Sequence, residues 1–337
     1  MTSAELEPAP DRADTPNSSP PKIVSIGGGT GSYNLLSGLK HHDCELTAVV
    51  TMMDSGGSSG RLRDEFGHLP PGDLRQCLLA LSHDDHSGRV LRQLFNYRFN
   101  KGNGLDGHSF GNLFLTALTE VTGSAERAID EMGRLLNIKG RVLPVTLTKS
   151  NLSARLRNGT IVEGETNIDR RKTESDVPID YVYLEPKAFV HPLTAEAITE
   201  ADAIVIGPGD LYTSIVPNLL VEGVNEALER SKGIRIFVCN LMTKPAESDG
   251  FKASDFIREV QNYLGSRVAL NHVIVNNQAL PEHIATRYLG ERSTQVAFDE
   301  EACLALVEDL LPRPLMAVAN FVRHDPDLLA DAIFELL

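Results

Sequence analysis

The chain has 337 residues, of which 42% are hydrophobic and 23% charged, so it is long enough to bury a substantial core. Its formal net charge is −14 and no run rich in Lys or Arg offsets it, which argues against nucleic acid and anionic membrane surfaces as general partners. No apolar stretch reaches membrane-spanning length, and the four cysteines are too scattered for a zinc site. We therefore expect a cytoplasmic protein with reduced thiols and no membrane insertion.

Two glycine-rich segments, each directly after a predicted strand, come first in the chain. A strand at residues 23–26 leads into residues 27–32 (GGGTGS), and a strand at residues 45–51 leads into residues 54–61 (DSGGSSGR). Glycine admits positive φ and lets backbone N–H groups approach an anion, and a helix that starts just beyond adds oriented donors. Because neighbouring parallel strands end at one crevice, the two loops together predict a phosphorylated ligand. Either loop alone could instead be a structural turn.

A block dense in helices follows, because apolar residues recur there every three or four positions. The predicted helices cover residues 74–81, 89–99, 109–121 and 125–136. Asp73 suits the N-cap of the first, whereas Arg75, one turn further in, is better placed for a phosphate. His108 and Asn112 can point hydrogen-bonding groups into the crevice, although a lone histidine is more often structural.

Residues 141–185 change character and predict a small β insertion. Strands are expected at residues 142–147, 152–156 and 160–162, and Asn158-Gly159 is a strong signal for a type I′ hairpin turn. Alternation of strands and helices then returns, with strands at residues 203–206, 234–239, 272–275 and 315–318 and a last helix at residues 327–336. The loop at residues 207–214 follows one of these strands, and its hydroxyl groups suit a phosphate or a sugar.

These elements predict an α/β fold of the Rossmann-like type: a mostly parallel sheet with a helical excursion and a small β insertion at about residues 141–185. Residues 1–20 are rich in Pro, Ser, Ala and acidic residues and predict a disordered tail, which leaves one α/β domain over residues 21–337.

A nicotinamide-dependent oxidoreductase is one hypothesis for the first glycine loop. A Gly-x-Gly-x-x-Gly fingerprint aligned on Gly27 and Gly29 finds Ser32 in place of the third glycine. In a dinucleotide-binding site, Asp54 would be the acidic residue at the end of the second strand that binds the ribose. Asp54 is, however, the first residue of a second glycine loop, which a nicotinamide site does not require. No Gly-x-x-x-x-Gly-Lys-[Ser/Thr] motif is present, which excludes a P-loop NTPase.

The motifs closely resemble the bacterial gluconeogenesis-factor family. The matching segments are residues 27–31, 54–63, 71–75, 107–112, 207–214, 240–243 and 276–277. Members of that family are required for cell shape on gluconeogenic carbon and bind UDP-sugars such as UDP-N-acetylglucosamine. The family is related to 2-phospho-L-lactate transferase, with which it shares its fold. The resemblance therefore implies a Rossmann-like sheet and a UDP-sugar or related nucleotide diphosphate as ligand; a homo-oligomer is compatible with it.

The loops and the resemblance together nominate a set of ligand-binding residues. They are Gly28, Gly29, Thr30, Gly31, Asp54, Gly57, Ser58, Asp73, Arg75, His108, Asn112, Gly207, Gly209, Tyr212, Asn240, Asn276, Tyr288 and Arg323. By the resemblance, the residues of the two glycine loops contact phosphates or metal-bound water, and Tyr288 and Arg323 contact the nucleotide sugar.

One departure from the family pattern bears on catalysis. Ser55 stands where relatives often carry a second aspartate, which leaves Asp54 as the one candidate carboxylate for Mg²⁺. We therefore expect a nucleotide-sugar-binding protein that requires no cofactor, with Mg²⁺ optional at Asp54. The alternative is a transferase of the 2-phospho-L-lactate type, which moves a phospho-hydroxyacid group from a nucleotide diphosphate donor, with Asp54 as its metal ligand.

Overall fold

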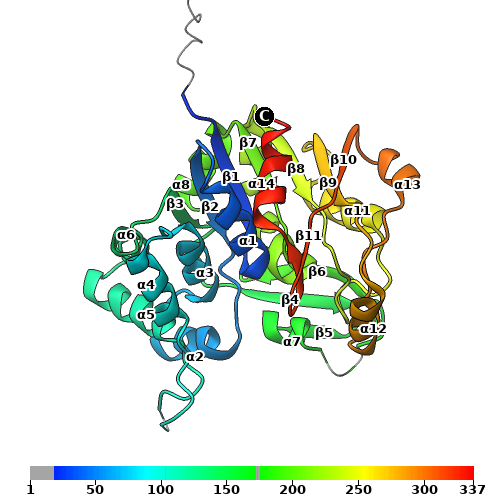
Figure 1. The fold of residues 1–337 in the computed structure, drawn as a ribbon. Coiled ribbons are helices and arrows are strands. Elements are labelled where there is room, and N and C mark those ends of the chain that lie inside the picture. Colours follow the sequence, from blue (N-terminus) through cyan, green and yellow to red (C-terminus); the bar gives the residue numbers. More distant parts are fainter. Residues whose placement is uncertain (1–18, 103, 172, 174) are drawn as a thin grey trace, which may run out of the picture.

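A computed structural model describes residues 19–102, 104–171, 173 and 175–337; residues 1–18 of the predicted tail lie outside the described residues. A seven-stranded sheet with the order β10-β9-β8-β7-β1-β2-β3 forms its centre, and every neighbouring pair is parallel (Figure 1). The strands are β1 (Lys22–Gly27), β2 (Glu45–Val50), β3 (Arg141–Pro144), β7 (Ala203–Ile206), β8 (Ile234–Val238), β9 (His272–Asn276) and β10 (Asp309–Arg313). The predicted Rossmann-like α/β class is confirmed.

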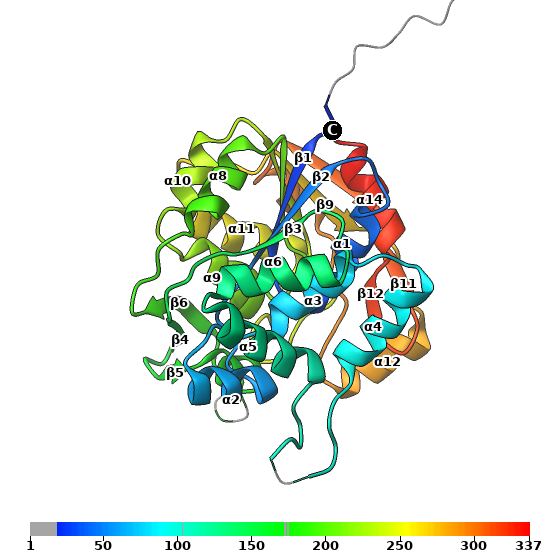
Figure 2. The ribbon, with the colours of Figure 1, turned by 90° about the vertical axis from the view of Figure 1, so that its left-hand side faces the viewer.

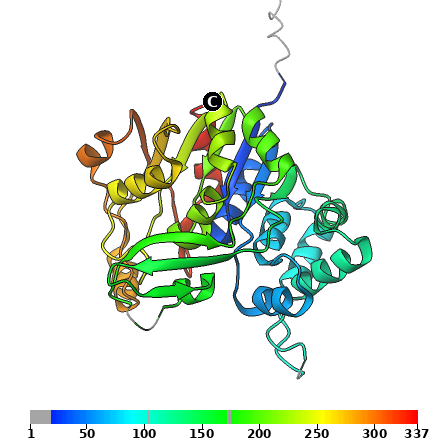
Figure 3. The same cartoon turned by 180° about the vertical axis from the view of Figure 1, so that it is seen from behind.

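Helices cover both faces of this sheet, which explains why its central strands are apolar on both sides. On one face α1 (Gly29–Leu39) packs between α3 (Gly72–Leu81) and α14 (Pro326–Phe334). The other face carries α8 (Pro192–Glu200), α9 (Val216–Leu219), α10 (Val224–Arg230) and α11 (Ala253–Leu264), in green and yellow in Figure 3. No helix of the described residues has the length and apolar character that crossing a bilayer requires.

The sheet order reverses between β1 and β7, which are neighbours in the sheet although about 180 residues apart in the chain. Chain direction is the same in every strand, so the loops after β1, β2, β7 and β8 all emerge at the carboxyl edge. Open α/β sheets bind ligands at such a switch point, outside the carboxyl ends of the strands.

The helical excursion lies between β2 and β3 and gathers beside the sheet (Figure 2). It comprises α2 (Gly57–Phe66), α3, α4 (His86–Asn96), α5 (Phe110–Thr122) and α6 (Ala125–Leu135). The sequence did not predict α2, because its first turn is the second glycine segment. Helix α4 starts three residues before the predicted start, since the Asp85 side chain accepts a hydrogen bond from the Gly88 N–H and caps the helix there.

The β insertion is shorter than predicted. Strand β3 pairs in parallel with β2 in the central sheet, so the insertion begins at Asn151 and not at residue 141. It consists of β4 (Asn151–Leu156), β5 (Ile161–Glu163), α7 (Glu165–Asp169) and β6 (Ile179–Glu185), and it lies across the carboxyl edge of the sheet (Figures 1 and 3). The β4–β5 hairpin is confirmed but the type I′ turn is wrong: of Asn158 and Gly159 only the glycine has positive φ, at 91°.

The remaining elements follow the last strands of the sheet or the loop after β7. They are the π-helical turn η1 (Leu211–Ile215), α12 (Glu282–Gly290), α13 (Glu300–Leu304), β11 (Met316–Val318) and β12 (Val322–His324). Strand β11, which was predicted as residues 315–318, pairs with β12 in a separate antiparallel ribbon and does not join the central sheet.

Candidate functional site

Two adjoining cavities lie along the carboxyl edge of the sheet. The first has a volume of about 470 Å³ and is lined by the start of α1, the loops after β7 and β8, and parts of α12 and β12. The second, of about 530 Å³, is lined by the starts of α2 and α3 and by α7. They meet at Gly28: a Cβ on this residue of the first cavity would lie 2.6 Å from Oδ2 of Asp73 in the second.

The first glycine segment is the N-terminus of a helix. Helix α1 begins at Gly29, which has φ of +64°. As at every helix start, its first backbone N–H groups have no partner within the helix, and that of Gly29 bonds to the Asp73 carboxyl. Gly31 allows α1 to approach the loop after β7, since a Cβ there would lie 2.2 Å from the Pro208 carbonyl oxygen. The predicted residues Gly28, Gly29, Thr30 and Gly31 all line the first cavity. This wall offers donors and a positive dipole end to an anion.

The conformation of Gly29 gives a direct prediction. Gly29→Ala should lower the free energy of unfolding by about 1–2 kcal/mol, because an L side chain is strained at positive φ although the nearest atom to its Cβ is 3.8 Å away. Gly290→Ala is the matched control, since Gly290 lies in a helix with open space around it and no positive φ. Urea unfolding measures both, and equal changes in the two variants would contradict the strain at Gly29.

Four further predicted residues from distant segments close the first cavity: Gly209, Asn240, Tyr288 and Arg323. Asn240 donates from Nδ2 to the Gly209 carbonyl oxygen at 2.6 Å, which ties the loop after β8 to the loop after β7. The Tyr288 hydroxyl accepts the Val322 N–H at 2.8 Å and holds β12 against α12. The Arg323 guanidinium forms no ion pair within the described part of the chain, so its charge is open to a ligand.

The second cavity presents a buried cation. Arg75 donates from Nε to Oδ1 of Asn112 at 2.9 Å and from Nη1 to Oδ1 of Asn96 at 2.5 Å. Both partners are neutral amides, and no carboxylate of the described residues forms an ion pair with Arg75. Burial, together with the nearby Arg98, lowers its pKa from the ordinary arginine value. This guanidinium is therefore fixed in place and can accept an anion from the cavity.

Four carboxylates line the same cavity: Asp54, Asp73, Glu165 and Asp169, the last of which is paired with Lys244. Burial and the repulsion of the neighbouring acids raise the pKa of Asp73 to about 8 and that of Glu165 to about 7. Asp54 accepts the Gly56 N–H on Oδ1 at 2.9 Å. Asp73 is not the N-cap of α3, which is Pro71; it lies in the first turn, with its carboxyl beside Gly28. Asp54 was the one carboxylate expected to bind Mg²⁺, and the structure places further acids from distant segments in the same cavity.

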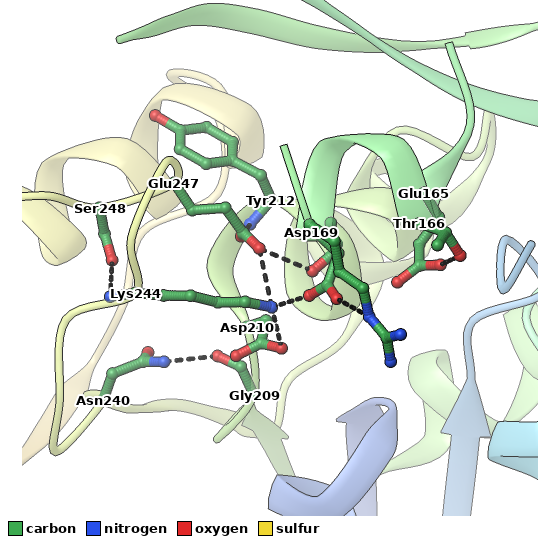
Figure 4. A network of polar contacts seen from close by, with 12 residues as sticks. Glu165, Thr166, Asp169, Gly209, Asp210, Tyr212, Asn240, Lys244, Glu247 and Ser248 are labelled. Atoms are coloured by element: carbon green, nitrogen blue, oxygen red, sulfur yellow. Dashed lines mark hydrogen bonds and ion pairs between the residues drawn. The ribbon is translucent and has the colours of Figure 1, made fainter. Parts of the chain in front are cut away.

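A partly buried lysine, Lys244, lines the first cavity and is paired with Asp169 of the second (Figure 4). Lys244 Nζ contacts Asp169 on α7, Asp210 after β7 at 2.6 Å and Glu247 at 2.9 Å. The Glu247 side chain is only 1% exposed and also accepts the Thr213 hydroxyl at 3.2 Å. Burial lowers the pKa of Lys244, but the three carboxylates outweigh this effect and hold it above the ordinary value. These four residues were not predicted from the sequence, and they fix the insertion to the switch-point loop.

Four predicted site residues line neither cavity. His108 is buried beside Ser58, with Nδ1 3.1 Å from its hydroxyl, and so supports a residue of the second cavity. Gly207 turns the chain behind the first cavity with φ of +81°. The Tyr212 hydroxyl points away to Glu259. Asn276 accepts the Leu315 N–H and donates to Gln278, and both contacts brace loops. Gly57, Ser58 and Asn112 do line the second cavity.

The fold and the cavities define an α/β protein with a Rossmann-like sheet whose crevice at the carboxyl edge is large enough for a nucleotide-sized ligand. The chain matches the 2-phospho-L-lactate transferase CofD family over residues 23–315, and it belongs to that family.

Individual relatives agree with the family match. A relative from Nostoc sp. is 44% identical over 94% of this chain and 68% of its own length. The gluconeogenesis factor of Bacillus subtilis is 40% identical over 94% of this chain and 98% of its own length. A crystal structure of a UPF0052 family member from Bacillus halodurans is 38% identical and has a TM-score of 0.88, covering 94% of this chain and all of that one. The resemblance found in the sequence motifs is confirmed.

Proposed function

We propose that this chain is a gluconeogenesis factor: a cytoplasmic protein that binds a UDP-sugar of the UDP-N-acetylglucosamine type and is needed for cell shape and growth on gluconeogenic carbon. The names of its relatives support the first part of this proposal. The observation that carries the ligand class is the meeting of two cavities at Gly28, with the N-terminus of α1 on one side and Arg75 on the other.

In this proposal the diphosphate lies at the junction of the cavities. The N–H groups at the start of α1 and the Arg75 guanidinium are its donors. Asp73 lies beside this position, and because its pKa is raised to about 8 it is mostly protonated at neutral pH and does not repel a phosphate. Asn240, Tyr288 and Arg323 then face the uridine or the sugar. No metal is required for this arrangement.

A transferase is the second candidate, and one observation favours it. Asp54, Asp73 and Glu165 converge in a cavity that also holds Arg75, and carboxylates beside phosphate oxygens are the ligands that Mg²⁺ prefers. These residues would hold the ion, which would stabilise the charge of a departing diphosphate. The chain would then transfer a phospho-hydroxyacid group to an alcohol. The family match favours both candidates over a nicotinamide-dependent oxidoreductase.

The ligand class is tested by thermal denaturation. UDP-N-acetylglucosamine at a hundredfold excess over its dissociation constant should stabilise the protein by about 2.7 kcal/mol, and NAD or NADP should give less. The matched comparison uses the same concentration of each nucleotide at one salt concentration. A larger stabilisation by NAD than by any UDP-sugar would favour the oxidoreductase and contradict the proposal.

Metal dependence separates binder from transferase. We expect wild-type protein to bind UDP-N-acetylglucosamine in EDTA nearly as tightly as in Mg²⁺, with no product after long incubation with candidate acceptors. The same titration on Asp54→Asn, monitored by calorimetry, supplies the comparison. Binding that requires Mg²⁺ and disappears in Asp54→Asn, together with slow turnover, would establish the transferase instead.

A further inference from the structure

One end of the first cavity carries hydrogen-bond acceptors without partners. His324, on β12, lines this cavity and is only 6% exposed. Its ring bonds to the backbone of Cys239, the residue directly after β8, and its Nε2 atom is buried without any hydrogen-bond partner. Burial lowers the pKa of His324 to about 4, so the ring is neutral at physiological pH. With the Cys239 carbonyl accepting the proton of the other nitrogen, Nε2 presents a lone pair.

The neighbouring Asn240 repeats the pattern. Its Nδ2 donates to the Gly209 carbonyl oxygen, which orients the amide so that Oδ1 is the free atom, and Oδ1 is also buried without a partner. An unpaired buried acceptor costs about 1–3 kcal/mol, so two of them in one cavity wall indicate a missing donor. The two cations of this wall do not supply it: Lys244 is held by its three carboxylates, and Arg323 forms no hydrogen bond with either acceptor.

We propose that His324 Nε2 and Asn240 Oδ1 form an acceptor end of the first cavity that selects ligands carrying an O–H or N–H donor on their uncharged part. This inference rests on the proposed function. It assigns hydrogen-bond donors to one end of the cavity and hydrogen-bond acceptors to the other. The start of α1 offers donors and receives phosphate, whereas the end formed by β8 and β12 offers acceptors. A fully ionised phosphate has only acceptor atoms and is rejected there. A sugar hydroxyl, an acetamido N–H or a uracil N–H satisfies the acceptor end.

Two variants of His324 distinguish a direct role in ligand recognition from a merely structural role. His324→Gln keeps an acceptor close to the position of Nε2 but loses the bond to Cys239. His324→Asn can keep that bond but has no atom at the position of Nε2. We expect His324→Asn to bind UDP-N-acetylglucosamine about tenfold more weakly than wild type, and His324→Gln to remain within about threefold. Both variants should bind inorganic pyrophosphate as wild type does, since it occupies the α1 end. Calorimetry measures all three proteins.

UDP as a third ligand locates the donor. A tenfold loss for UDP as well as for UDP-N-acetylglucosamine places the donor on the uridine, and a loss for UDP-N-acetylglucosamine alone places it on the sugar; both results support the inference. Three results would overturn the inference: weaker binding of UDP-N-acetylglucosamine by His324→Gln than by His324→Asn, unchanged binding by His324→Asn, or an equal loss of affinity for pyrophosphate.

A measurement on the wild-type protein keeps the inference testable if His324→Asn does not fold. The ¹⁵N resonance of His324 Nε2 should move upfield on addition of UDP-N-acetylglucosamine, as a neutral ring nitrogen does when it accepts a hydrogen bond, and should stay unchanged with pyrophosphate. Binding without this shift overturns the inference and leaves the proposed function intact. Wild-type protein that binds no UDP-N-acetylglucosamine would instead overturn the proposed function, and the inference with it.

Discussion

Lys244→Met should lower the free energy of unfolding by about 3–5 kcal/mol at pH 7.5, because it removes the cation that compensates the buried Glu247 carboxylate 2.9 Å away. The loss should be smaller at pH 5.5. Burial already raises the pKa of Glu247 to about 7 while Lys244 lowers it, so without the lysine Glu247 takes up a proton readily in acid. Urea unfolding at the two pH values measures both effects.

Two further variants show whether the loss of stability in Lys244→Met arises from the buried charge of Glu247. Lys22→Met breaks an exposed ion pair with Glu200, which solvent screens, and should destabilise the protein far less than Lys244→Met. The double variant Lys244→Met, Glu247→Gln should recover part of the loss, since the amide carries no charge that needs compensation. If Lys244→Met lowers the free energy of unfolding no more than Lys22→Met does, the stabilising role of Lys244 and its three carboxylate partners is contradicted.

Asp73→Asn should change how stability depends on pH. The folded-state pKa of Asp73 is raised to about 8, so in wild type its contribution to stability is fully present below about pH 4 and is lost as the pH rises through about 8. The asparagine stays neutral throughout. We expect the two proteins to differ by less than about 1 kcal/mol at pH 5, and the variant to be more stable by about 3 kcal/mol at pH 9. This magnitude is about half of what the raised pKa of Asp73 alone would give, because the neighbouring acids titrate together with it.

Chemical denaturation at pH 5, 7 and 9 measures this difference, with Asp43→Asn, an exposed aspartate in the loop before β2, as the control. Parallel curves for wild type and Asp73→Asn would show that Asp73 is not perturbed. The same series with Mg²⁺ reports on the transferase candidate without any assay of activity. If Asp54, Asp73 and Glu165 hold the ion, Mg²⁺ should stabilise wild type at pH 9 and have less effect on Asp73→Asn.

The sequence predicts the centre of the fold well because its strands are buried on both faces. The apolar run of β1 and the glycine segment that follows it need no tertiary information to be recognised. Strand β10 was not predicted, because Asp309–Arg313 contains charges and Pro312 and is tolerated only at the edge of the sheet. Helix α2 was not predicted because glycine and serine disfavour helix, and its first turn is fixed by contacts with α5.

Site residues that follow strands could be predicted, whereas those brought in by packing could not. Gly28 directly follows β1 and Asn240 lies two residues after β8, where the topology alone places a ligand. Glu165 and Asp169 lie on α7 in the insertion, and tertiary contacts, including those with Ser55 and Lys244, bring them to the edge of the sheet. The orphan acceptor of His324 depends on the pairing of β11 with β12, which the sequence does not indicate.

A crystal structure of the protein with UDP-N-acetylglucosamine would test the ligand site most directly. We expect the diphosphate at the junction of the two cavities, with its oxygens against the N–H groups at the start of α1 and within reach of Arg75, and the uncharged part of the ligand toward Asn240 and His324. A diphosphate bound elsewhere on the surface, or a phosphate group placed against His324, would contradict this assignment.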